Sequence, residues 1–254
     1  MRDFNVKLKV FQIGGVQAIA ALAFGTVSVP KVNKIVGPGN IFVTLAKREV
    51  YGIVGIDGIT GPTEAVILAD ESADPELIAS DLLAQAEHDF LSIPILLTTS
   101  PELAKTVKNS IEEQISKLSR AEIAQYAIEN NGGIIVVTSI KDAISVVNNF
   151  APEHLSIITK DQEEILPKIK NAGGVFLGES SCEVMGDYVA GPSHVMPTGG
   201  AAKFSSPLSV LDFLKITSLI ALDTKTVKSI APLAEQLALN ENLTAHSEAA
   251  RRRT

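Results

Sequence analysis

The stretch AVILADESADPELIASDLLAQAEHDFLSIPILLT, residues 65–98, carries the pattern that decides the fold. It opens with one apolar run of strand length, Ala65–Leu68, and closes with another, Ile93–Thr98. Between them Pro75–His88 has a helical pattern, and Asp74 can cap this helix while proline suits its first position. A strand, a helix and a strand in this order predict two parallel strands joined by a crossover helix.

The same alternation continues along the chain. Further strands are predicted at Ile134–Thr138 and Leu155–Thr159. The remaining helical patterns of this region are Glu102–Leu118, Ala121–Asn130, Lys141–Asn149 and Gln162–Asn171. Because such helices serve as crossovers between parallel strands, we expect an α/β fold with a doubly wound, mostly parallel sheet.

Two regions flank this sheet. Residues 1–62 are expected to form a small α/β unit, and residues 63–207 the main α/β domain. The elements expected in the first unit are a helix at Val16–Ala23, a strand at Lys34–Val36 and a helix at Phe42–Val50. Residues 208–254 have helical patterns at Val210–Ile216 and Thr224–Asn240, which predict a helical tail.

Composition and charge argue against several classes of protein. The chain has 254 residues, of which 46% are hydrophobic and 20% charged, so a globular fold is expected rather than disorder. A formal net charge of −7 argues against a nucleic-acid binder. The single cysteine, Cys182, excludes a disulfide within the chain. Because Met1–Lys7 has no signal-peptide core and no apolar run is long enough to cross a bilayer, we expect a cytoplasmic protein.

Three segments combine glycine and proline with polar residues: Gly37–Asn40, Gly61–Glu64 and Gly186–His194. Glycine lets a ligand approach the backbone closely, so loops of this kind can bind ligands. For any one segment alone, a tight turn is the simpler interpretation. The sequence contains neither a Gly-x-Gly-x-x-Gly fingerprint nor a P-loop, so a nucleotide site would be unconventional.

Two residue pairs could carry chemistry. Gln85 and His88 are expected on one face of a last helical turn, where a metal could bridge them, although a helix-end histidine is commoner. Glu153 and His154 precede a strand and suit general acid–base work, although a solvated pair is the alternative. All four histidines, His88, His154, His194 and His246, lie in polar or loop contexts. Two of them with carboxylate or amide oxygens would make a plausible zinc site.

Several long segments, in this order, resemble the histidinol dehydrogenase family over nearly the whole chain. The matching segments are Gly14–Leu22, Val29–Val32, Ile35–Asn40, Ala69–Pro75, Asp81–His88, Asn149–Leu155, Gly186–Gly200 and Phe204–Val210. The resemblance implies two incomplete Rossmann-like domains and a helical tail. It implies a zinc- and NAD-dependent oxidation of L-histidinol, through L-histidinal, to L-histidine. It also implies a homodimer whose subunits exchange tails and share the active site.

The resemblance also assigns roles to individual residues. The implied zinc ligands are Gln85, His88, Asp187 and, from the other subunit, His246. His154 would remove the hydroxyl proton and Glu153 would activate water. The implied substrate contacts are Thr63, Gln85, His88, His154, Asp187, His194, Glu241 and His246, and the implied NAD contacts are Gln17 and Asn40. Thr63 stands where the family usually has serine.

Family members begin considerably earlier than this sequence. We therefore expect the chain to lack strands of both domains and a tyrosine of the NAD site, and on its own to produce no measurable NADH. Two alternatives use the same residues. One is a zinc-dependent hydrolase, and the other is a non-catalytic homologue that binds a metabolite.

Overall fold

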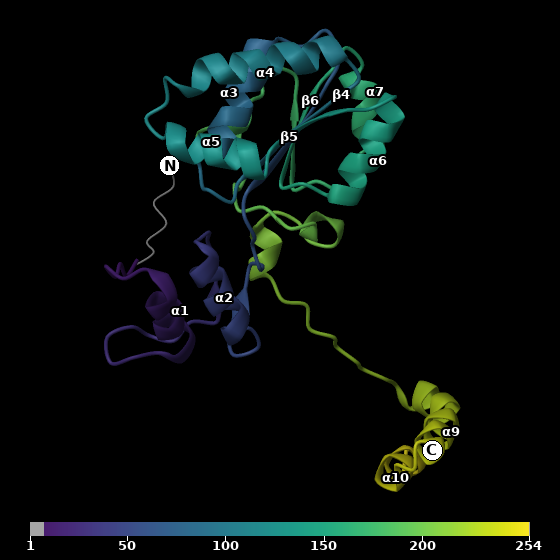
Figure 1. Ribbon diagram of the computed structural model, residues 1–254. Helices are drawn as coiled ribbons and strands as arrows, with labels where there is room; N and C mark the ends of the chain where they lie inside the picture. The colour runs from purple at the N-terminus through teal and green to yellow at the C-terminus, as the bar shows by residue number, and fades with distance from the viewer. Residues whose placement is uncertain (1–7, 254) are drawn as a thin grey trace. The chain divides into compact units, whose positions relative to one another are not determined.

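The computed structural model describes residues 8–253, so the interpretation of Met1–Lys7 lies outside the described residues. The chain forms two compact units, one ending at Asp212 and the other beginning at Phe213 (Figure 1). Within residues 8–253, no helix is long and apolar enough to cross a membrane.

The larger unit is built on a parallel sheet of five strands. In chain order they are β3 (Glu64–Ala69), β4 (Ile93–Thr98), β5 (Gly133–Val136), β6 (His154–Ile158) and β7 (Gly174–Leu177). Their order in the sheet is β5-β4-β3-β6-β7, and every pairing is parallel. The prediction of a parallel α/β fold is thus confirmed, and β3 and β6 are neighbours although six other elements separate them in sequence.

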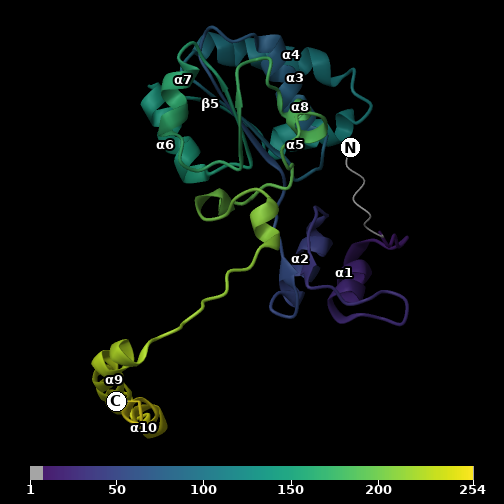
Figure 2. The same cartoon turned by 180° about the vertical axis from the view of Figure 1, so that it is seen from behind.

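Helices cover both faces of this sheet (Figures 1 and 2). One face carries α3 (Pro75–Ala86), α4 (Pro101–Ile115) and α5 (Ala121–Asn130), and the other carries α6 (Ile140–Phe150) and α7 (Gln162–Ile165). Side chains alternate along β3, so that Ile67 packs in the cluster under α3 and Leu68 in the cluster under α6. A strand buried on both faces explains the continuous apolar run in the sequence.

Several predicted boundaries are wrong. The helix expected at Pro75–His88 ends at Ala86, and a turn begins where the amide of His88 donates to the carbonyl of Gln85. The helix expected at Gln162–Asn171 shrinks to α7 and a 3₁₀ turn at Leu166–Lys168, because Pro167 has no amide to continue it. The helix expected at Val210–Ile216 is only a 3₁₀ turn, Val210–Phe213.

Smaller differences affect the other elements. The Glu102–Leu118 pattern is α4, three residues shorter at its end, and the Ile134–Thr138 run is β5, which ends at Val136. Strand β7 and helix α8 (Glu183–Tyr188) were not expected, and the first part of Gly186–His194 is therefore helix rather than loop. Both elements are short, so neither shows a clear period in the sequence.

The N-terminal part of the larger unit is a small layer of its own. Strands β1 (Lys34–Ile35) and β2 (Gly55–Ile56) pair in parallel, and α1 (Gly15–Phe24) and α2 (Ile41–Val50) pack with them. The side chain of Asn40 caps α2 by accepting from the amide of Val43 at 3.1 Å. The segment Met196–Gly200 ties this layer to the sheet. The hydroxyl of Thr198 accepts from the amide of Gly61, and Glu64 Oε1 accepts from that of Gly199.

The C-terminal unit consists of two helices that pack on each other, α9 (Thr224–Asn240) and α10 (Thr244–Arg251). Asp223 caps α9 by accepting from the amide of Thr226 at 2.7 Å. The predicted helix at Thr224–Asn240 is confirmed, whereas α10 was not predicted as a separate helix.

Two leucines of α3 test the assignment of its buried face. Leu82 is 1% exposed and Leu77 is 42% exposed. We expect Leu82→Ala to lower the free energy of unfolding by about 2–5 kcal/mol because it leaves a cavity under α3. Leu77→Ala, which changes the same helix by the same atoms, should cost less than about 1 kcal/mol. Equal losses for the two variants in urea denaturation would contradict the packing of α3.

Candidate active site

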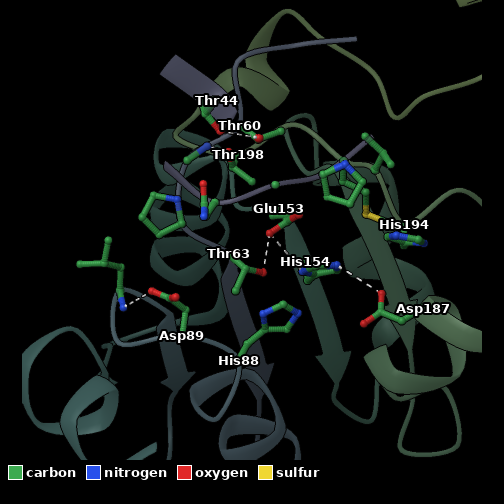
Figure 3. Close-up of a pocket in the computed structure, with 18 of the residues that line it drawn as sticks. Thr44, Thr60, Thr63, His88, Asp89, Glu153, His154, Asp187, His194 and Thr198 are labelled. Atoms are coloured by element: carbon green, nitrogen blue, oxygen red, sulfur yellow. Dashed lines mark hydrogen bonds and ion pairs between the residues drawn. The ribbon is translucent and has the colours of Figure 1, made fainter. Parts of the chain in front are cut away.

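A cavity of about 570 Å³ opens at the edge of the sheet where β3 and β6 begin. This volume is in the range of small-molecule sites, roughly 300–1,000 Å³. Among the residues that line it are Thr63, His88, Glu153, His154, Asp187 and His194 (Figure 3). The structure thus gathers six residues that the sequence places in four separate segments.

The register of β3 against β6 brings four of the polar groups together. Ala65 pairs with His154, so Thr63 and Glu64 lie beside the residues that start β6. This is the amino edge of the sheet, whereas open α/β sheets commonly bind ligands at the carboxyl edge. At the carboxyl edge the amide of Asp74, the N-cap residue of α3, donates to Glu179 Oε1 at 2.7 Å.

A directed chain of hydrogen bonds leads into the cavity from α3. The Gln85 amide nitrogen donates to Thr63 Oγ1 at 2.7 Å, and that hydroxyl donates to Glu153 Oε2 at 2.6 Å. The same carboxylate oxygen accepts from the backbone amide of Glu64 at 3.2 Å. The chain of hydrogen bonds uses the side-chain nitrogen of Gln85 and not its oxygen. That oxygen, Oε1, is buried and has no hydrogen-bond partner in the described structure.

Burial changes the acidity of Glu153. Desolvation raises the pKa of Glu153 to about 7, and the nearby carboxyl groups of Glu64 and Asp187 act in the same direction. The hydrogen bonds from Thr63 and from the Glu64 amide oppose this rise but are smaller. A carboxyl group with such a pKa can both lose and regain a proton near neutral pH.

The ring of His154 is oriented by the backbone of the neighbouring strand. Its Nδ1 lies 3.3 Å from the carbonyl oxygen of Glu64, and a carbonyl can only accept, so Nδ1 carries the proton. Its Nε2 is buried without a hydrogen-bond partner in residues 8–253 and lies 3.9 Å from Asp187 Oδ1 (Figure 3). Burial lowers the pKa of His154 against the opposing effect of Asp187, which favours a neutral ring with Nε2 free to accept a proton.

Helix α8 brings acidic side chains to this ring. Asp187 was expected at the site, and it lies near His154. Glu183 was not expected, yet its Oε1 is 3.4 Å from His154 Nδ1, and burial raises the pKa of Glu183 well above its ordinary value. Nothing local in the sequence marks Glu183, because it enters the site only through a short helix one turn before Asp187.

The expected zinc ligands are brought together in part. His88 and Asp187 line the cavity. Gln85 supplies the unpartnered buried oxygen, and an amide oxygen with an imidazole and a carboxylate is a donor set that fits zinc. His246 belongs to the C-terminal unit and is exposed there. Among residues 8–253, no cluster of three or more His, Cys, Asp or Glu side chains has a metal-binding arrangement.

Of the four remaining expected site residues, two line the cavity and two do not. Asn40 and His194 line the cavity. Gln17 is exposed on α1, outside the set of residues that form the cavity, and Glu241 is exposed in the C-terminal unit. Residues of the cavity that the sequence did not single out include Thr44, Thr60, Met196 and Thr198.

Comparison with known proteins gives a consistent result. The family model of histidinol dehydrogenase matches residues 4–254. Histidinol dehydrogenase of Dehalococcoides mccartyi is 51% identical over 245 residues, 96% of this chain and 56% of that protein. Its counterpart in Clostridium acetobutylicum is 53% identical over 239 residues, 94% of this chain and 56% of that protein. The crystal structure of histidinol dehydrogenase from Elizabethkingia anophelis has a TM-score of 0.86 at 41% identity, covering 94% of this chain and 55% of that one.

The chain therefore spans little more than half the length of these relatives. The resemblance noted in the sequence is confirmed by the family match, by the relatives and by the shared fold. This chain belongs to the histidinol dehydrogenase family.

Proposed function

We propose that this chain carries the acid–base and zinc-binding part of a histidinol dehydrogenase. The reaction is the oxidation of L-histidinol to L-histidinal, followed by hydration and a second oxidation to L-histidine, with two NAD reduced. The observation that supports this best is the pair Glu153 and His154 in one cavity, where burial raises one pKa and lowers the other. A carboxyl group with a pKa near neutrality beside an imidazole that burial keeps neutral suits proton transfers.

His154 is the proposed base of the first oxidation. Removal of hydride from an alcohol carbon requires that the hydroxyl proton leave as well. Nε2 of His154 is unprotonated in the neutral ring and has no partner in the described residues, so it can accept that proton. The Glu64 carbonyl on Nδ1 holds the ring in place and favours this tautomer.

Glu153 is the proposed base of the hydration step. Its carboxylate would take a proton from the water whose oxygen bonds to the aldehyde carbon, giving the hydrate that is oxidised next. Thr63 and the Glu64 amide hold one carboxylate oxygen, which leaves the other for the water. Thr63 is also linked to Gln85, so the position of the base depends on the same side chain that supplies the unpartnered oxygen.

The residues that would hold the cofactors follow from the donor atoms. Gln85, His88 and Asp187 would bind zinc, and His246 of a second copy would complete the set in a cytoplasmic homodimer. Zinc would supply a positive charge that orients the amine and imidazole of the substrate. NAD would accept hydride, and Asn40 in the cavity wall and Gln17 on α1 are its proposed contacts. His194 and, from the second copy, Glu241 are proposed to contact the substrate together with Thr63.

Production of NADH from L-histidinol tests the function. We expect two NADH per L-histidinol when the chain is combined with the N-terminal part of a longer relative, such as that of Clostridium acetobutylicum. The chain alone is expected to produce none. A folded combination that binds L-histidinol but forms no NADH would contradict the proposal and would favour a hydrolase or a non-catalytic homologue.

Zinc content tests the role of His88. We expect His88→Ala to lower the zinc content of the purified protein at least about tenfold, because alanine has no imidazole to bind the metal. His194→Ala is the matched control, since it removes the same group from the same cavity without removing a proposed ligand. Metal analysis that finds equal zinc in the two variants would remove His88 from the zinc site.

The pH dependence of stability tests the burial of Glu153. Because the pKa of Glu153 is about 7 in the folded protein against an ordinary 4.5, the folded state keeps a proton that the unfolded chain has released. Stability contributed by this group is therefore lost as the pH rises from about 4.5 to about 7. Glu153→Gln should be more stable than the wild type at about pH 8, by up to about 3 kcal/mol, and lose this advantage near pH 4.

Glu71→Gln gives a control of opposite sign. The pKa of Glu71 is lowered by its own backbone amide and by Lys160, so its carboxylate favours the folded state at high pH. This variant should gain no stability at about pH 8 relative to about pH 4. Urea denaturation at both pH values measures the difference, and a Glu153→Gln variant that behaves like Glu71→Gln would contradict the burial of that carboxyl group.

A further inference from the structure

A buried ion pair lies in the N-terminal layer, outside the group of polar residues around His154. The side chain of Lys47, on α2, is 2% exposed, and that of Asp57, directly after β2, is 3% exposed. Lys47 Nζ forms an ion pair with Asp57 Oδ1. Lysine is almost never buried unless it is paired. Because both charges lose their hydration, a buried pair is a weak source of stability and is better explained by what it holds in place.

Both members of the pair bind the same backbone residue. Lys47 Nζ donates to the carbonyl oxygen of Gly37 at 3.0 Å, and Asp57 Oδ2 accepts from the amide of Gly37 at 2.7 Å. Asp57 Oδ1 also accepts from the amide of Gly58 at 2.9 Å. Hydrogen bonds to ionised groups are stronger than those between neutral groups. Gly37 is therefore held at its donor and at its acceptor by two opposite buried charges.

Gly37 begins the segment that forms one wall of the cavity. Its φ of +124° is a conformation that residues with a side chain rarely adopt. Pro38, Gly39 and Asn40 follow it, and all three line the cavity. A Cβ atom on Gly39 would lie 2.5 Å from Val43 Cγ1, so the segment is also pressed against the first turn of α2. Its path is thus fixed at its start by charge and at its end by packing and the Asn40 cap.

The same pair fixes the second segment of this wall. Asp57 and Gly58 lead to Thr60, which lines the cavity and contacts Thr44 of α2 through their hydroxyl groups at 3.3 Å. Figure 3 shows Thr44 and Thr60 on the opposite side of Glu153 from His88. One ion pair therefore anchors both segments that face the acid–base residues from this side.

We propose that Lys47 and Asp57 are positioning residues for the bound dinucleotide. They hold the Gly37–Asn40 segment as the surface against which NAD is bound, opposite Glu153 and His154. The identity of the ligand rests on the proposed function, whereas the fixation of the segment does not. Neither residue reaches the reacting atoms, so their effect is on the affinity for NAD rather than on proton transfer.

The test removes both charges at once, because removing one would leave the other buried and unpaired. The double variant Lys47→Met with Asp57→Asn keeps similar volumes and one acceptor for the Gly37 amide. Its matched control is Lys160→Met with Glu71→Gln, which neutralises an exposed ion pair at 3.1 Å elsewhere in the sheet unit. Gly37→Ala is a second variant that leaves the ion pair intact, since a Cβ there meets no atom within 4 Å but strains the backbone.

Two measurements are made on these variants. Amide hydrogen exchange of the chain itself should be at least about tenfold faster over residues 37–44 in the double variant, with β3 unchanged. In the complete enzyme, the KM for NAD should rise about tenfold with kcat within about twofold, for the double variant and for Gly37→Ala alike. The Lys160 and Glu71 control should change neither quantity.

The outcomes separate this proposal from the proposed function. Unchanged exchange over residues 37–44 in the double variant overturns the positioning role, whatever the activity. Faster exchange there, when the complete enzyme forms no NADH even with wild-type sequence, supports the fixation of the segment and refutes the function. If the double variant unfolds, Gly37→Ala decides: an unchanged KM for NAD overturns the proposal, and a raised KM with unchanged kcat supports it.

Discussion

The pairing of β3 with β6 is the constraint on which the candidate site depends. It places the backbone of Glu64 between Glu153 and His154, so that its amide holds the carboxylate and its carbonyl holds the imidazole. Both groups of Glu64 belong to the main chain, and their positions follow from the register of the sheet. A slip of one residue in this register would turn every side chain of the strand to the other face and would separate the two catalytic candidates.

Burial gives these residues their chemistry. Strands β3 and β6 are buried on both faces, and the site lies at their amino ends. Desolvation there raises the pKa of Glu153 and lowers that of His154. The carboxyl group of Glu153 therefore keeps its proton to a higher pH than a free carboxyl group, and the imidazole of His154 stays neutral to a lower pH than a free imidazole. Hydrogen bonds from Thr63 and Glu64 keep the buried carboxyl group satisfied.

The two walls of the cavity are held by different means. Around Glu153 and His154, a five-stranded sheet with two apolar clusters provides the rigidity. The wall at Gly37–Asn40 belongs to a layer with two strands of two residues each and one small apolar cluster. So little apolar contact cannot by itself fix a loop rich in glycine, and the buried charges of Lys47 and Asp57 supply directional bonds instead.

Local patterns in the sequence determined the kind of structure and the candidates for chemistry. The apolar runs predicted a parallel α/β fold, the Asp74 cap predicted the start of α3, and the family motifs pointed to Glu153, His154, Gln85 and His88. The predicted ends of several helices were wrong, since the turn at His88 and the break at Pro167 depend on which backbone hydrogen bonds form. Only the tertiary structure decided that β3 lies beside β6, that α8 brings Glu183 to His154, and that Lys47 meets Asp57 beneath Gly37. The physical reason is that period and capping act between residues a few positions apart, whereas strand order and desolvation arise from contacts between segments distant in the chain.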